Sequence, residues 1–131
     1  MNKIRIVIAD DHEVVRKGLM LVLRQEQEFE IVAEAHNGRE AVALAVQYQP
    51  DLVLLDWKMP EMDGLAAAAT IRQQMPGVRT LVLSGAPIET EVLDALDNGV
   101  DGFVHKDTSP ASLLAPPSNG RHLVTPWLMR T

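Results

Sequence analysis

The sequence contains no cysteine, no internal repeat and no apolar run long enough to cross a membrane. Without cysteine the chain forms neither disulfides nor cysteine-based metal sites, which is compatible with a reducing compartment. The first apolar run, residues 4–9, is too short for a signal peptide or a membrane span, and two aspartates follow it. We therefore expect a cytoplasmic protein with no membrane partner.

The chain also lacks an excess of positive charge, because its formal net charge is −6. Nucleic acids and anionic membranes are themselves negative, so this balance disfavours non-specific binding to either. Hydrophobic residues make up 47% of the 131 residues, a composition typical of a globular protein. The length fits one domain that buries a real core.

Short aliphatic runs alternate with longer amphipathic segments. The aliphatic runs predict five strands, at residues 4–9, 29–35, 51–56, 79–84 and 102–105. The segments between them predict four helices, at residues 12–26, 37–48, 64–75 and 88–98. This alternation favours an α/β fold with a parallel sheet. A chain of this size most simply forms a doubly wound, flavodoxin-like sheet of five strands in the order 2-1-3-4-5.

Several residues predict how these elements pack and begin. In the first helix we expect an inward face at helical spacing, made of Val15, Leu19, Val22 and Leu23. The strand at 51–56 is apolar on both sides, as a buried central strand of a parallel sheet should be. Asn37 is expected to cap the second helix.

The C-terminal region departs from this regular alternation. Ser109 and Pro110 predict the start of a fifth helix, but Pro116 and Pro117 follow within two turns. Proline in a helix interior costs about 3 kcal/mol or more. We therefore expect a shortened or broken fifth helix, followed by a tail whose apolar residues, Trp127 among them, cover the exposed groove or dock on a neighbouring chain.

Polar residues stand at the carboxyl ends of four of the predicted strands. They are Asp10 and Asp11 after the first strand, Asp56 at the end of the third, Ser84 at the end of the fourth and Lys106 after the fifth. Ligands of open parallel sheets bind outside these strand ends. We therefore expect three carboxylates, a hydroxyl and an ammonium to gather at one edge of the sheet.

Some of these residues also have a purely structural interpretation. Asp10 and Glu13 have the spacing of a capping box for the first helix. Asp63 is expected to cap the next helix rather than to join the site. His12 is interpreted as a residue of the first helical turn rather than as a metal ligand. Trp57, taken alone, is expected to be a half-exposed ring that covers the loop.

Three clustered carboxylates repel one another, and a hard divalent cation such as Mg²⁺ relieves that repulsion. A cation beside an ammonium and a hydroxyl forms a site suited to a phosphoryl group. A carboxylate can itself accept a phosphoryl group and become an aspartyl phosphate.

Four separated segments, "ADDH", "DWKMPEMDG", "LVLS" and "DGFVHKD", resemble the receiver domain of bacterial two-component response regulators. The resemblance covers roughly residues 3–114. It is greatest to the subclass that carries a LuxR-type helix-turn-helix output domain. It implies a receiver domain over residues 1–114 and a linker-like tail over residues 115–131, with the output domain absent from this chain.

The resemblance also implies roles for the residues at the strand ends. Asp56 would be the phosphoacceptor, taking its phosphoryl group from a histidine kinase. Asp11 and Asp56 would bind Mg²⁺ directly, together with the backbone carbonyl of Lys58, and Asp10 would bind it through water. Lys106 would hold the phosphoryl group.

Two further residues would form the switch that the resemblance implies. Ser84 would close onto the phosphoryl group, and Phe103 would repack as it does so. The resulting phosphoprotein would control an output, transcription in this subclass, and would reach DNA only through its output domain. The resemblance admits a homodimer. It implies no enzyme activity beyond Mg²⁺-dependent transfer to Asp56 and hydrolysis of the product.

Three other classes of protein compete with this interpretation. A phosphatase of the haloacid-dehalogenase type requires an aspartate at position 58, where this chain has Lys58. A flavodoxin-type FMN binder wants small residues after the first strand, where this chain has aspartates that would repel phosphate. A degenerate receiver, acting as a phosphorylation-independent interaction module, stays open as the alternative.

Overall fold

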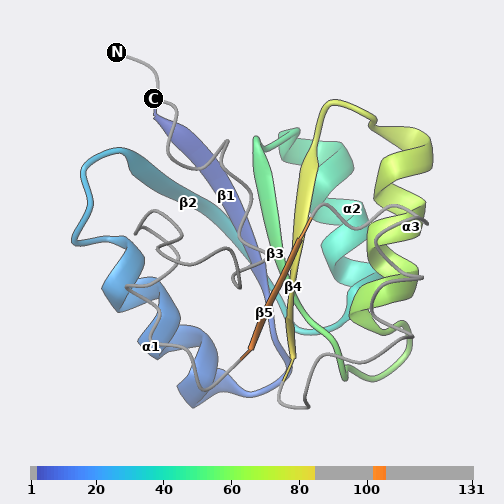
Figure 1. The fold of residues 1–131 in the computed structure, drawn as a ribbon, viewed down its shortest axis with the longest axis horizontal. Helices are drawn as coiled ribbons and strands as arrows, with labels where there is room; N and C mark the ends of the chain where they lie inside the picture. The colour runs from blue at the N-terminus through green and yellow to red at the C-terminus, as the bar shows by residue number, and fades with distance from the viewer. Residues whose placement is uncertain (1–2, 85–101, 106–131) are drawn as a thin grey trace, which may run out of the picture.

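The computed structural model describes residues 3–84 and 102–105, and these form a parallel sheet with helices on both faces (Figure 1). The five strands lie in the order β2-β1-β3-β4-β5, and all neighbouring pairs are parallel. Their bounds are Ile4–Ala9 for β1, Phe29–Ala35 for β2, Leu52–Asp56 for β3, Arg79–Ser84 for β4 and Gly102–His105 for β5. The predicted doubly wound sheet and its strand order are confirmed.

Three described helices connect the first four strands: α1 is Glu13–Leu23, α2 is Gly38–Tyr48 and α3 is Gly64–Gln74. Helix α1 covers one face of the sheet, whereas α2 and α3 cover the other (Figure 1). None of these helices is long and apolar enough to cross a membrane. The predicted helix at 88–98, the shortened fifth helix and the tail at 115–131 lie outside the described residues.

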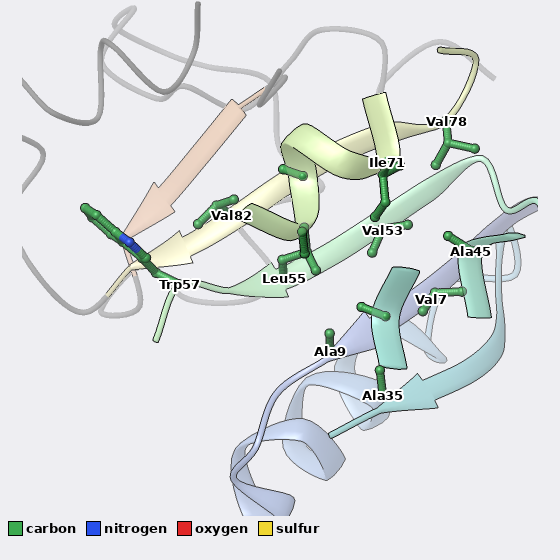
Figure 2. Close-up of a cluster of buried hydrophobic side chains, with 13 residues drawn as sticks. Val7, Ala9, Ala35, Ala45, Val53, Leu55, Trp57, Ile71, Val78 and Val82 are labelled. Carbon is green, nitrogen blue, oxygen red and sulfur yellow. The ribbon is translucent and has the colours of Figure 1, made fainter. Parts of the chain in front are cut away.

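The sheet is buried on both faces because its central strand, β3, is apolar at every position except the last. In β3, Leu52 and Leu54 join the core on the α1 side, and Val53 and Leu55 join the core on the side of α2 and α3. Figure 2 shows the second of these cores, with β3 in its middle. All five residues of β3, Asp56 included, are buried, as the sequence predicts for a central strand.

The inward face of α1 differs from the predicted one by a small rotation of the helix. Leu19 and Leu23 are buried, as predicted, but Val15 is 45% exposed. The buried residues are instead Arg16, Leu19, Met20 and Leu23. The prediction for Val15 is therefore wrong, and Val22 is only partly buried, because the helix turns Arg16 and Met20 toward the sheet instead.

Side-chain caps fix where α2 and α3 begin. The Asn37 side-chain oxygen accepts a hydrogen bond from the Glu40 amide at 2.7 Å, and Asp63 Oδ1 accepts one from the Ala66 amide at 2.8 Å. Both predicted caps are confirmed. The capping box predicted for Asp10 and Glu13 is wrong, since His12 is the N-cap residue of α1.

Candidate functional site

Four polar residues meet at the carboxyl edge of the sheet, where β1 and β3 end side by side. Ala9 of β1 lies opposite Leu55 of β3, so the next residues, Asp10 and Asp56, leave the sheet at the same level. One ligand-type atom from each of Asp10, Asp11, His12 and Asp56 lies within 4.8 Å of the others. The structure thus brings together the three carboxylates that the sequence placed at this edge.

Burial makes this group of carboxylates costly. Asp10 is 1% exposed and Asp56 is 2% exposed, whereas Asp11 and His12 reach solvent. Oδ1 of Asp10 accepts the His12 amide at 2.8 Å, but its buried Oδ2 has no hydrogen-bond partner among the described residues. A buried carboxylate oxygen needs compensation by hydrogen bonds or by positive charge. The donor set therefore fits a hard divalent cation, whose preferred ligands are carboxylate oxygens.

His12 lies beside the carboxylates as the N-cap residue of α1 rather than as a residue of its first turn. Its Nδ1 is 3.2 Å from Asp11 Oδ1 and 3.4 Å from Asp10 Oδ1. The His12 side chain is 65% exposed, so solvent screens these contacts. Its interpretation as a residue beside the site, rather than as a metal ligand, stays a prediction.

Trp57 is buried, and the expectation of a half-exposed ring is wrong. It is 9% exposed and belongs to the core on the side of α2 and α3, at the opposite end from Val78 (Figure 2). Its amide donates to the carbonyl of Leu83 at 2.9 Å, so the pairing of β3 with β4 continues one residue past Asp56. The Nζ of Lys58 lies 4.8 Å from the centre of the Trp57 ring, a cation–π contact.

The loop after Asp56 is held by two close backbone approaches at the starts of α2 and α3. The Gly64 amide donates to the Trp57 carbonyl at 2.8 Å. A Cβ on Gly64 would lie 2.3 Å from the carbonyl oxygen of Asp56, and one on Gly38 would lie 2.0 Å from that of Met62. Only glycine fits at such distances, so these two positions set where the loop beside the phosphoacceptor candidate runs.

A second network, absent from the sequence predictions, supports the site from behind. Arg16 donates from Nη1 to the Asp10 carbonyl at 2.7 Å and from Nε to Glu34 Oε1 at 2.8 Å. Lys17 donates to both oxygens of Glu34, at 2.9 and 3.0 Å. The Arg16 hydrogen bond, and then that of Lys17, holds the pKa of Glu34 below its ordinary value. The sequence signal that could have revealed this role is the helical spacing of Arg16 with Leu19 and Leu23, which places the arginine on the same inward face.

For the other predicted site residues, the structure describes only the strand register of Ser84 and Phe103. Ser84 is the last residue of β4 and lies opposite His105 of β5 in the strand register, and Phe103 lies opposite Val82. The side chains of Ser84 and Phe103, and all of Lys106, lie outside the described part of the structure. Their roles stay predictions.

Comparisons with known proteins identify the family. The model of the response regulator receiver domain matches residues 6–116. The receiver domain of NarL from Mycobacterium tuberculosis superposes with a TM-score of 0.81 at 35% identity, covering 85% of this chain and 90% of that one. The chain therefore belongs to the response regulator receiver domain family.

The relatives agree with the predicted subclass. A LuxR-family two-component response regulator from Aurantimonas superposes with a TM-score of 0.80 at 32% identity, covering 86% of this chain and 80% of that one. The transcriptional regulatory protein DegU of Brevibacillus brevis is 40% identical over 113 residues, which are 86% of this chain and 48% of DegU. The chain spans about half the length of the curated relatives that it matches.

Proposed function

We propose that Asp56 is the phosphoacceptor of this receiver domain and that a histidine kinase supplies the phosphoryl group. The observation that carries the proposal is the position of Asp56: it ends the buried central strand and lies within 4.8 Å of the Asp10, Asp11 and His12 ligand atoms. In the transfer, an Asp56 carboxylate oxygen forms a bond to phosphorus while the phosphorus–nitrogen bond of the donor histidine breaks. The histidine nitrogen recovers a proton.

The metal-binding residues in this proposal are Asp11, Asp56 and the carbonyl of Lys58, with Asp10 acting through water. When Mg²⁺ is bound, it neutralises charge on the carboxylates and on the incoming phosphoryl oxygens. The chain contributes a fixed geometry. The close approaches at Gly38 and Gly64 position the loop that carries the Lys58 carbonyl, and the pairing of Trp57 with Leu83 fixes the end of β3.

The switch follows from the same resemblance. Lys106 holds the phosphoryl group, Ser84 closes onto it, and Phe103 repacks with that closure. One new dianionic group thereby biases a two-state element. Within the whole protein, a cytoplasmic regulator, this change controls transcription through a DNA-binding output domain, and the subclass admits a homodimer. Residues 1–114 form the receiver domain and residues 115–131 the linker-like tail.

The arrangement of carboxylates favours this function over a phosphorylation-independent interaction module. Burying two carboxylates side by side costs free energy that a module with no phosphoryl chemistry has no need to spend. The family membership and the gathered donor set support the proposal together.

Incubation with Mg²⁺ and acetyl phosphate, followed by intact-mass measurement, tests the proposal. We expect an added mass of one phosphoryl group that disappears in Asp56→Asn and on chelation of the metal. Asp63→Asn is the matched control, because it makes the same chemical change at a helix cap outside the carboxylate group and should still be phosphorylated. No adduct on the wild-type protein, or one that survives Asp56→Asn, would overturn the assignment.

A further inference from the structure

Arg16 is a buried charged residue that the phosphorylation chemistry does not use. Its side chain is 3% exposed, although it lies on α1, a helix with one face open to solvent. Arginine is seldom buried to this extent unless its guanidinium is fully engaged. Two of its nitrogen atoms bind different parts of the chain: Nη1 binds the Asp10 carbonyl just after β1, and Nε binds Glu34 of β2.

The carbonyl that Arg16 binds belongs to the peptide unit joining Asp10 to Asp11. The orientation of this peptide sets the direction in which both carboxylates leave the backbone. The preceding peptide is held as well, because the Asp10 amide donates to the Ala35 carbonyl at 3.1 Å. The Asp10 side chain is held through Oδ1, which accepts the His12 amide at 2.8 Å. Arg16 thus completes a set of contacts that leaves the Asp10 backbone little freedom.

Glu34 gives the guanidinium its orientation. Glu34 of β2 pairs with Ile8 of β1, and Ile8 stands two residues before Asp10. The Glu34 carboxylate accepts a hydrogen bond from Arg16 Nε at 2.8 Å. A guanidinium group is planar, so a hydrogen bond that holds Nε in place also fixes the direction in which Nη1 points. A lysine has one nitrogen atom on a mobile stem and cannot reproduce this two-point geometry.

We propose that Arg16, oriented by Glu34, is a positioning residue for the divalent-cation site: it holds the Asp10–Asp11 peptide so that both carboxylates face the cation. This inference rests on the proposed function, because that function assigns the cation to these carboxylates. Groups that orient the ligands of a metal typically change its affinity by about 10–100-fold when they are removed.

Positioning and simple electrostatics predict opposite results, which makes the inference testable. Replacing Arg16 by methionine removes a positive charge from the neighbourhood of a cation site. By charge alone, this change would strengthen cation binding. Loss of the peptide's orientation would weaken it. Lys17 supplies the matched control, since it binds the same Glu34 carboxylate but makes no hydrogen bond or ion pair with Asp10 within the described structure.

The experiment is a Mg²⁺ titration of the whole chain. NMR monitors binding through the chemical shifts of the backbone amides of Asp10 to His12 and of Trp57. The proteins compared are the wild type, Arg16→Met, Arg16→Lys and Lys17→Met, each at a temperature well below its own melting point. We expect Mg²⁺ to bind roughly tenfold more weakly to Arg16→Met. Arg16→Lys should fall between the two, and Lys17→Met should stay within about twofold of the wild type.

The possible outcomes distinguish failure of the positioning role of Arg16 from failure of the proposed function. Wild-type affinity or tighter binding in Arg16→Met would overturn the positioning role while leaving the proposed function in place. Equal weakening in Arg16→Met and Lys17→Met would also overturn it, because Lys17 does not touch the Asp10 peptide. If Arg16→Met fails to fold, Arg16→Lys decides: unchanged affinity there overturns the role. Absence of Mg²⁺ binding by the wild type would overturn the proposed function and the inference together.

Discussion

Asp10 and Asp56 leave neighbouring strands at the same level, both almost fully buried, with ligand atoms no more than 4.8 Å apart. Two negative charges at this distance and in this environment repel each other strongly. The β1–β3 register fixes the spacing, since Ala9 pairs with Leu55 immediately before them. Holding these two carboxylates together therefore costs part of the stability of the sheet, and a bound cation offsets that cost.

The first prediction concerns the metal-free protein. Asp56→Asn removes one of the repelling charges with almost no change of shape, so it should stabilise the fold in the absence of Mg²⁺. We expect a gain of about 1 kcal/mol, equivalent to roughly 3–5 °C in melting temperature for a domain of this size. Thermal unfolding in the presence of a chelator, followed by circular dichroism, measures it.

Asp63→Asn controls for the loss of a negative charge in general. Asp63 accepts the Ala66 amide at the start of α3, and asparagine caps helices about as well as aspartate. This variant should melt within about a degree of the wild type. An equal gain in both variants would trace the stabilisation to net charge, and a lower melting temperature for Asp56→Asn would show that the carboxylates are not under strain.

The second prediction concerns the pH dependence of the Glu34 ion pairs. Arg16 and then Lys17 lower the pKa of Glu34 from its ordinary value of 4.5. A carboxyl group with a lowered folded-state pKa stabilises the fold above its unfolded-state pKa, and that contribution is lost as the pH falls through the folded-state pKa. Glu34→Gln should therefore cost about 1–2 kcal/mol at pH 7 and less and less below pH 4.5.

Urea unfolding of the wild type and of Glu34→Gln at a series of pH values gives the difference directly. Comparing the two proteins at each pH cancels the protonation of the other carboxylates, which acts on both. The result that contradicts the prediction is a difference that stays constant between pH 7 and the acid limit of folding. It would mean that the cost reflects shape and packing rather than the charge of Glu34.

Much of this fold follows from periodicity alone. All five strands begin and end within one residue of the predicted bounds, because each apolar run is bounded by polar or turn-forming residues. The carboxylates at the site were predictable for the same reason: Asp10, Asp11 and Asp56 directly follow or end such runs, and parallel strands bring those ends to one edge.

The features that could not be predicted depend on contacts between distant elements. Arg16 is polar, so hydrophobic periodicity does not place it on the inward face of α1, and its partner Glu34 lies on another element, β2. Trp57 looked like a loop residue, but its hydrogen bond to Leu83 extends the sheet and draws the ring inward. Asp10 has capping-box spacing, yet its carboxylate binds the His12 amide within the loop. Each result depends on tertiary pairing that a local pattern does not contain.

A third prediction separates two roles of Asn37. Its side-chain oxygen caps α2 by accepting the Glu40 amide, and its Nδ2 donates to Glu61 Oε2 at 3.0 Å, where Glu61 has a positive φ of 67°. Asn37→Ala should cost about 1–2 kcal/mol, since it loses both. Asn37→Asp keeps the cap but places a carboxylate against Glu61, so we expect an intermediate loss that shrinks as salt is added. Urea unfolding at low and high salt measures both losses, and wild-type stability in Asn37→Asp would show that the contact with Glu61 adds nothing.

The last prediction uses one substitution, glycine to alanine, at two positions with opposite expected signs. At Gly64 the new Cβ would lie 2.3 Å from the Asp56 carbonyl oxygen, so the loop or α3 must move, at a cost of about 1–3 kcal/mol. At Gly18, inside α1, the new Cβ would meet no heavy atom within 4 Å beyond its chain neighbours and the backbone of its own helix. Alanine there should stabilise the helix by about 0.5–1 kcal/mol. Denaturant unfolding measures the sign of both changes.

Because Gly64 contacts the residue that bears the proposed phosphorylation, Gly64→Ala should also slow adduct formation from acetyl phosphate, whereas Gly18→Ala should leave it unchanged. Equal phosphorylation rates in the two variants would separate the close approach at Gly64 from the chemistry at Asp56.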